Sequence, residues 1–227
     1  MLSDLLLIYK QLFAAYGEQH WWPGRDRFEI IVGAILTQQV TWKNVEKALA
    51  ALKAAGLLNP ETLLRASLDE VAALIRPTIY YNEKAKKLRS FLLFLQERHH
   101  GDLSDLFSLP LPTLREELLS VHGIGEETAD SIILYAAEKP SFVIDAYTRR
   151  IMQRLGLIRG KEPYSSLRAL FMENIPRDVK LYNEYHALLV RHGKERCRSR
   201  SPLCLDCPLS NICKGSSRLR HDSSEEG

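Results

Sequence analysis

The sequence predicts an all-α fold, and two observations carry this prediction. Apolar residues recur along most of the chain at the three-to-four-residue spacing that places them on one face of a helix. Runs in which β-branched and polar residues alternate, the pattern of a half-buried strand, are almost absent. With 227 residues, the chain can bury a full core, as one large domain or as two small interlocked ones.

The first helix is predicted at the start of the chain, where the apolar side chains fall on one helical side: Leu2, Leu5, Leu6, Tyr9, Leu12, Phe13 and Tyr16. This stretch has neither a basic leader nor a long uninterrupted apolar core, so we expect an amphipathic helix and not a signal peptide. No stretch of the sequence reaches the roughly 18 to 20 apolar residues of a membrane span. We therefore expect a cytoplasmic, nucleoid-associated protein whose thiols are kept reduced.

The remaining helices follow from the same periodicity. After the aromatic link HWWPGRDRF, helices are predicted over 28–37, 42–55, 61–64, 68–75, 82–96 and 111–120, and later over 146–155, 164–174 and 180–194. Residues 215–227 contain almost no apolar side chains and are expected to be a disordered tail.

The stretch from Leu118 to Asp145 combines two helices, a glycine hairpin and an aspartate. Gly123, Ile124 and Gly125 form the hairpin, and its second helix is predicted to run to about residue 138. Glycines permit close backbone approach, and amides at a helix start face outward, so the hairpin can hold a DNA phosphate. A glycine pair between helices is also often only a turn, and an aspartate that opens a helix is usually a cap.

All four cysteines lie in one short segment near the end of the chain: Cys197, Cys204, Cys207 and Cys213. In a reduced compartment this clustering predicts metal ligation and not disulfides. Thiolates suit zinc or an iron–sulfur cluster, and the spacing alone does not choose between them.

The hairpin GIGEETAD, the aspartate about twenty residues later, and the cysteine spacing after HGKERC together resemble the helix-hairpin-helix DNA glycosylases of the endonuclease III superfamily. The resemblance covers about residues 20 to 214. It implies a six-helix lobe over 24–137 and a second lobe from 1–23 and 138–214, which carries a [4Fe-4S] cluster in the loop 197–213. It also implies that Arg198 and Arg200 form a cationic patch for DNA phosphates.

In this family, the position of Asp145 serves hydrolysis of the N-glycosidic bond, and the position of Gln39 carries a side chain that enters the gap left by the flipped base. Bifunctional members carry a lysine that attacks the sugar at the position of Glu127, where a carboxylate cannot form that adduct. The resemblance thus implies a monofunctional enzyme. Adenine mismatch glycosylases need a glutamate where this chain has Gly33, so their activity is not expected.

Two segments, WWPGRDRFEIIVGAILTQQVTW and RPTIYYNEKAKKL, resemble the 3-methyladenine glycosylases of the endonuclease III-like branch. In that branch the positions of Trp21, Trp22, Pro23 and Trp42 line the pocket for the damaged base, and Glu127 is expected beside them. An alkylated purine is cationic and stacks favourably on indole faces. That branch need not carry the cluster, and any one tryptophan could instead be a core residue.

The sequence therefore predicts a monomeric, monofunctional glycosylase that flips alkylated purines, chiefly 3-methyladenine, out of double-stranded DNA. Two alternatives stay open: the same fold could act on mismatched thymine or uracil or on oxidised pyrimidines, or the protein could bind damaged DNA without catalysis. The formal net charge of +3 does not by itself show a nucleic-acid partner. The seven histidines have no metal-binding spacing and are expected to be surface or satisfied residues.

Overall fold

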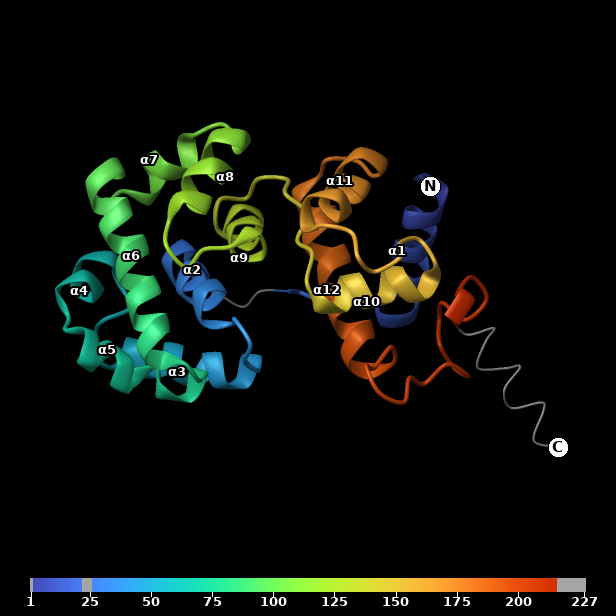
Figure 1. The fold of residues 1–227 in the computed structure, drawn as a ribbon, viewed down its shortest axis with the longest axis horizontal. Coiled ribbons are helices and arrows are strands. Elements are labelled where there is room, and N and C mark those ends of the chain that lie inside the picture. The colour runs from blue at the N-terminus through green and yellow to red at the C-terminus, as the bar shows by residue number, and fades with distance from the viewer. Residues whose placement is uncertain (1, 22–25, 216–227) are drawn as a thin grey trace. The chain divides into compact units, whose positions relative to one another are not determined.

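The computed structural model describes residues 2–21 and 26–215. These residues form twelve α-helices, a 3-10 helix, a π-helical turn and no strand, which confirms the predicted all-α class (Figure 1). None of the described helices is long and apolar enough to cross a membrane. The chain divides into two compact units: unit 1 contains Met1–Trp21 and Pro140–Gly227, and unit 2 contains Trp22–Lys139.

Unit 2 is built around α2 (Arg27–Leu36), which packs against α3, α6, α9 and the π-helical turn η2. Asp26 caps this helix, because its carboxylate accepts a hydrogen bond from the Glu29 amide at 2.8 Å. Every side chain from Ile31 to Leu36 is buried, so α2 has almost no polar face and must lie in the core. The other elements of the unit are α3 (Trp42–Ala54), α4 (Pro60–Arg65), α5 (Leu68–Leu74), η1 (Arg76–Thr78), α6 (Tyr81–His99), α7 (Leu103–Ser108), α8 (Leu111–Ser120), α9 (Glu126–Ser131) and η2 (Ile132–Ala136).

Helix α7 was not predicted from the sequence. Asp102 caps it by accepting a hydrogen bond from the Ser104 amide at 2.7 Å, and the helix buries Leu106 and Phe107. Six residues are too few to show a helical period, so only the cap marks this element in the sequence.

The second helix of the hairpin is not the single helix to residue 138 that the sequence predicts. It is α-helical only as far as Ser131 and then widens into η2, where the Ala137 amide donates to the Ile132 carbonyl at 3.0 Å. This five-residue step inserts one extra residue into the turn. Hydrophobic periodicity could not reveal this π-helical turn, because all five side chains of η2 are buried and the segment therefore has no polar face to mark its period.

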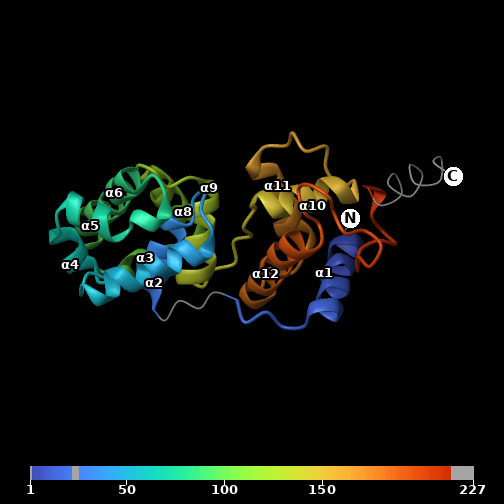
Figure 2. The same cartoon turned by 90° about the horizontal axis from the view of Figure 1, so that it is seen from below.

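Unit 1 joins the two ends of the chain. Helix α10 (Ala146–Leu155) packs against α12 (Val179–Glu195), and α1 (Leu2–Tyr16) lies alongside α12 (Figure 2). Helix α11 (Tyr164–Asn174) contributes Phe171, which stacks on Phe142 with ring centroids 3.9 Å apart. The buried Tyr185 hydroxyl donates to the Leu5 carbonyl at 2.8 Å and thereby fastens α1 to α12.

Candidate functional site

Asp145 is the cap of α10 in unit 1. Its carboxylate accepts a hydrogen bond from the Thr148 amide at 2.7 Å, and its side chain is 13% exposed. Burial by itself raises the pKa of Asp145, but the interactions with His186 and with Thr148 outweigh burial and hold the pKa below its usual value. The site thus keeps a nearly dehydrated carboxylate ionised at neutral pH.

His186 is a residue of this site that the sequence did not reveal. Its Nε2 lies 3.6 Å from Oδ2 of Asp145, and its side chain is only 7% exposed. We expected a surface or satisfied histidine, and instead the fold places this imidazole against the candidate catalytic group. The two residues are far apart in the chain, so no local spacing links them.

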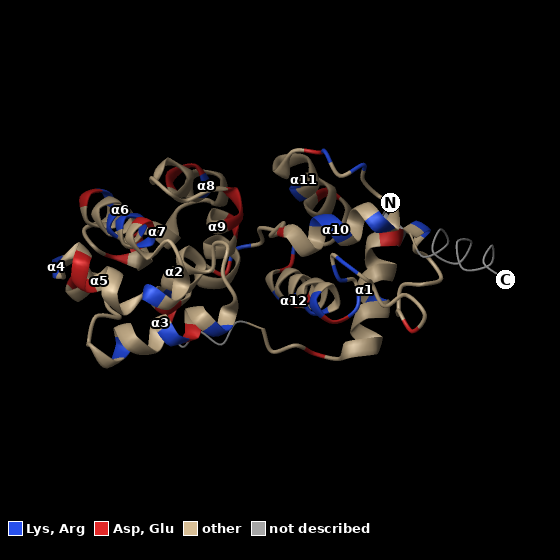
Figure 3. Ribbon diagram, turned by 60° about the horizontal axis from the view of Figure 1, so that its bottom comes forward, with Lys and Arg blue, Asp and Glu red and all other residues tan. Residues whose placement is uncertain are grey.

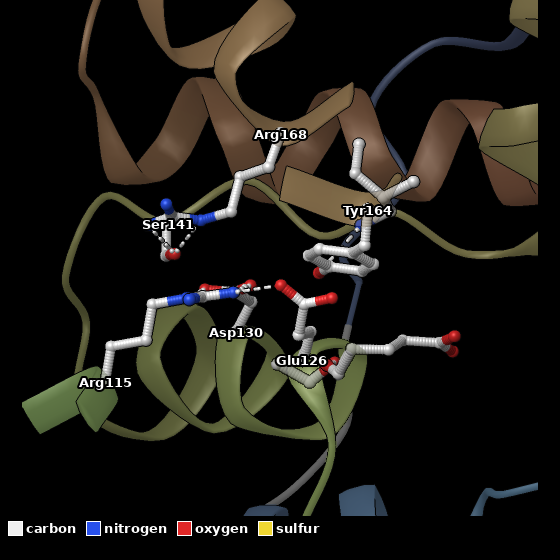
Figure 4. A network of polar contacts seen from close by, with 9 residues as sticks. Arg115, Glu126, Asp130, Ser141, Tyr164 and Arg168 are labelled. Carbon is white, nitrogen blue, oxygen red and sulfur yellow. Dashed lines mark hydrogen bonds and ion pairs between the residues drawn. The ribbon is translucent and has the colours of Figure 1, made fainter. Parts of the chain in front are cut away.

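The segment that leads into Asp145 is held by α11 (Figure 4). The Arg168 guanidinium donates to the Ser141 hydroxyl at 3.1 and 2.8 Å, and the Tyr164 hydroxyl accepts a hydrogen bond from the Ile144 amide at 3.2 Å. These contacts lie on either side of Phe142, which is fully buried. Asp145 therefore leaves a fixed segment of backbone and enters a capped helix.

In unit 2, the hairpin has a closely packed side and an open side. Gly123 has a φ of +87°, and a Cβ there would lie 2.3 Å from Cγ of Lys87, so only glycine fits. Gly125 has an ordinary φ of −92°, and a Cβ there would meet nothing within 4 Å. Ile124 between them is buried and anchors the loop in the core. A side chain at position 125 would therefore clash with no part of the fold, so packing does not explain why this residue is glycine.

Carboxylates gather at the start of α9, where Glu126 and Glu127 occupy the first turn (Figure 3). Arg115 of α8 reaches across to Glu126 at 3.2 Å and to the fully buried Asp130 at 3.0 Å (Figure 4). This ion pair ties the two helices of the hairpin together and offsets part of the negative charge near the loop. No such pairing is apparent in the sequence.

Gln39 lies in an exposed turn between α2 and α3. Its φ is +57°, which is uncommon for a residue with a side chain, and the turn is closed by the Val40 amide and the Thr37 carbonyl at 3.2 Å. The neighbouring Gln38 side chain faces the hairpin, where Nε2 donates to the Gly123 carbonyl at 3.1 Å. Within unit 2 the fold therefore brings the predicted inserting residue and the predicted phosphate-holding loop to one region.

Unit 2 has a second exposed turn, between η1 and α6. Ile79 and Tyr80 both have positive φ, 54° and 50°, and their side chains are 52% and 65% exposed. The buried Lys84 ammonium supports this turn from below, since it donates to the Thr78 carbonyl at 2.6 Å and to the Leu36 carbonyl at 2.9 Å. The fold thus holds these two exposed side chains on a fixed turn.

The predicted base-pocket residues are divided between the units. Trp21 lies in unit 1, with the Lys194 ammonium 5.7 Å from its ring centroid and with a buried indole N–H that has no acceptor among the described residues. Trp42 lies in unit 2, packs against the core and donates to Glu46 at 3.0 Å. Trp22 and Pro23 lie outside the described residues, as does nearly all of the predicted disordered tail.

The four cysteines, Cys197, Cys204, Cys207 and Cys213, line one cavity of about 80 Å³ in unit 1. The Arg154 guanidinium of α10 donates to Sγ of Cys197 at 3.2 Å, and none of the cysteines is in a disulfide. Among the described residues, no group of three or more histidine, cysteine or acidic side chains is close enough to hold a single metal ion. The four thiols line one cavity with apolar walls, and the Arg154 guanidinium lies beside one of them. This lining fits a prosthetic group that several thiolates bind together.

The cysteine segment is also tied to the helix that carries Asp145. Arg150 donates to the carbonyl of Cys197 at 2.8 Å, and Arg154 donates to the carbonyl of Arg198 at 2.6 Å. Both of the predicted DNA-contacting arginines, Arg198 and Arg200, are exposed. Unit 1 thus holds the candidate carboxylate at one end of α10 and the cysteine segment at the other.

Comparisons with known proteins show the family to which this all-α chain belongs. The family described as "HhH-GPD superfamily base excision DNA repair protein" matches residues 32–177. The Methanocaldococcus jannaschii protein MJ1434, provisionally named a DNA repair glycosylase, is 46% identical over 208 residues, which are 91% of this chain and 94% of the relative. Endonuclease III of Thermotoga maritima is 28% identical over 189 residues, which are 83% of this chain and 83% of the relative.

Two solved structures have the same fold. A non-covalent endonuclease III–DNA complex superimposes with a TM-score of 0.83 at 23% identity, covering 97% of this chain and 99% of that one. The 3-methyladenine DNA glycosylase MagIII of H. pylori, solved with 1,N6-ethenoadenine, superimposes with a TM-score of 0.70 at 27% identity, covering 86% and 95%. The match over most of the chain and the 46% identical relative establish the family. This chain belongs to the HhH-GPD superfamily of base excision DNA repair proteins, as an endonuclease III-like DNA glycosylase.

Proposed function

We propose that this protein is a monofunctional DNA glycosylase that removes alkylated purines, chiefly 3-methyladenine, from double-stranded DNA. The observation that carries the proposal is Asp145, a buried carboxylate whose pKa is held down by His186 and the Thr148 amide.

The proposed reaction is hydrolysis of the bond between the base and C1′ of the deoxyribose. As that bond lengthens, positive charge develops on the sugar, and the ionised Asp145 carboxylate stabilises it. The water oxygen then bonds to C1′, and its proton passes to Asp145 or to solvent. A purine alkylated at a ring nitrogen already carries a positive charge, so it leaves with the bonding electron pair as a neutral molecule. No protein acid is needed to protonate it.

Glu127 supports hydrolysis without strand cleavage. A lyase reaction needs an amine that attacks C1′ and forms a Schiff base, and a carboxylate cannot do so. The carboxylates of Glu126 and Glu127 would also attract a cationic base more than a neutral one. The products would be the free base and an abasic site on an unbroken strand.

The preference for alkylated purines is supported by two observations. Trp21 already holds a cation against its ring, and its buried indole N–H is available to a hydrogen-bond acceptor on a base. A relative at 27% identity is a 3-methyladenine DNA glycosylase, solved with 1,N6-ethenoadenine. Trp22, Pro23 and Trp42 are the other proposed pocket residues, and a damaged base costs less to flip than a normal one.

The cysteines are proposed to hold a [4Fe-4S] cluster. When bound, the cluster would fix a segment that has few apolar residues of its own. Arg198 and Arg200 would then be presented to DNA phosphates from a rigid loop, while the hairpin at Gly123, Ile124 and Gly125 grips the backbone elsewhere. We propose a monomer that works on DNA in the cytoplasm or nucleoid.

Two alternatives follow from specific observations. Members of this superfamily include a thymine-DNA glycosylase from Aeropyrum pernix that is 26% identical, so a mismatched or oxidised pyrimidine is the second candidate substrate. A protein that binds damaged DNA without catalysis is the third candidate, since cysteines and hairpin could serve binding alone.

The test is a panel of duplexes that each contain one lesion: 3-methyladenine, 1,N6-ethenoadenine, mismatched thymine, uracil or an oxidised pyrimidine. The proposal predicts release of 3-methyladenine and an abasic strand that breaks only after alkali. Release of pyrimidines alone would favour the second candidate. Tight binding to damaged duplexes without any release would favour the third.

A further inference from the structure

Gln38 makes three side-chain contacts that join separate parts of unit 2. Its Nε2 donates to the Gly123 carbonyl at 3.1 Å and to the Thr128 hydroxyl at 3.0 Å, and its Oε1 accepts from the Lys87 ammonium. One carboxamide therefore connects the turn after α2, the hairpin loop, the first part of α9, and α6. All of its hydrogen-bonding directions but one are used.

The surroundings show that this junction is closely packed. The stem of Lys87 lies against Gly123, where even a Cβ would approach to 2.3 Å. Thr128 is buried, and Gln38 is half-buried, so these hydrogen bonds are partly shielded from water. A side chain without polar atoms at position 38 would leave the Lys87 ammonium and the Thr128 hydroxyl without this partner.

Gln39, the next residue, is exposed and has a left-handed backbone. Its direction depends on the turn from Thr37 to Val40, which is closed by one backbone hydrogen bond of 3.2 Å, and the Thr37 hydroxyl adds a bond of 2.6 Å to the Gly33 carbonyl. These local bonds fix the turn against α2. Among the hydrogen bonds of the described residues, those of Gln38 join this turn to the hairpin.

We infer that Gln38 is a positioning residue that holds the turn of Gln39 at a fixed place relative to the hairpin, so that gripping the DNA backbone and filling the gap left by the flipped base occur in register. The inference rests on the proposed function, in which Gln39 enters that gap. Gln38 would touch no DNA and would act through Gln39.

The test uses Gln38→Met, which keeps the length of the side chain and removes its hydrogen bonds, together with Gln39→Ala and the double variant. The first readout is fluorescence of 2-aminopurine opposite an abasic-site analogue, which reports insertion and needs no catalysis. The second is the single-turnover rate of 3-methyladenine release. Affinity for undamaged duplex monitors the hairpin separately.

We expect Gln38→Met to reduce both the insertion signal and the release rate by roughly tenfold, the equivalent of about 1.4 kcal/mol. Affinity for undamaged duplex should change less than twofold, as a rough limit. In the double variant the loss should be close to that of Gln39→Ala alone, because a residue that acts through Gln39 has nothing to position once that side chain is absent. Gln96→Met, on the exposed face of α6, is the matched control and should behave as wild type.

Losses that multiply in the double variant would overturn the inference, since they would mean that Gln38 acts independently of Gln39. An unchanged insertion signal in Gln39→Ala would overturn it as well. If Gln38→Met does not fold, Thr128→Val removes one of the same hydrogen bonds and should show a smaller loss with the same non-additivity. Absence of base release by the wild type, with a normal insertion signal, would refute the hydrolytic function and leave the role of Gln38 standing.

Discussion

Replacing Asp145 with asparagine separates the charge of this residue from its role as a helix cap. The asparagine Oδ1 can still accept the Thr148 amide, now at 2.7 Å, and asparagine caps helices as well as aspartate does. The interaction of the Asp145 charge with His186 is lost, and the expected loss of stability is about 1 to 2 kcal/mol. The ionised oxygen that would stabilise the sugar cation is also lost, and we expect base release to fall at least about a hundredfold.

The assay is single-turnover release of 3-methyladenine from alkylated duplex, with DNA affinity measured by fluorescence anisotropy and stability by urea denaturation. Asp178→Asn is the matched control, because Asp178 caps α12 in the same unit by accepting the Leu181 amide at 2.7 Å. The control should retain release and affinity, and Asp145→Asn should retain affinity alone. A folded Asp145→Asn protein that releases the base at the wild-type rate would refute the assignment of Asp145.

Four other predictions follow from the structure. His186→Gln should raise the pKa of Asp145. Because the wild-type pKa lies below 3.8, the Asp145 carboxylate loses its charge, and the rate falls, only below that pH; in the variant this fall should begin at a higher pH. Identical pH–rate profiles would contradict this prediction. Burial, followed by the nearby Lys87, lowers the pKa of Lys84 from 10.5 to about 8. The unfolded chain therefore binds the extra proton between these values, and wild type should gain about 3 kcal/mol of unfolding free energy relative to Lys84→Met as pH rises across that range in urea titrations; parallel curves would contradict the shift. Glu127→Lys should allow borohydride trapping on DNA, whereas trapping of the wild type would contradict monofunctionality. Cys197→Ser should lose iron measured by metal analysis, and a colourless wild type with stoichiometric zinc would contradict the cluster.

The sequence predicted those features that depend on local spacing. Helical periodicity predicted the all-α class. The cysteine clustering predicted metal ligation, and the four thiols line one cavity because residues close in the chain meet in space with little help from the rest of the fold. The role of His186 could not be predicted, since it depends on α12 packing against α10. The contacts of Gln38 depend likewise on where α6 and the hairpin lie. The π-helical turn leaves no trace in a segment that is apolar on all sides.

The proposed activity is hydrolytic removal of an alkylated purine without strand cleavage. The most direct measurement is a single-turnover reaction of the purified wild-type protein with a duplex that carries 3-methyladenine at one site, divided into two samples. We expect free 3-methyladenine in the first sample, and in the second an unbroken strand that gives no borohydride adduct and breaks only after alkali. Failure to release 3-methyladenine, or an adduct at the abasic site, would contradict it.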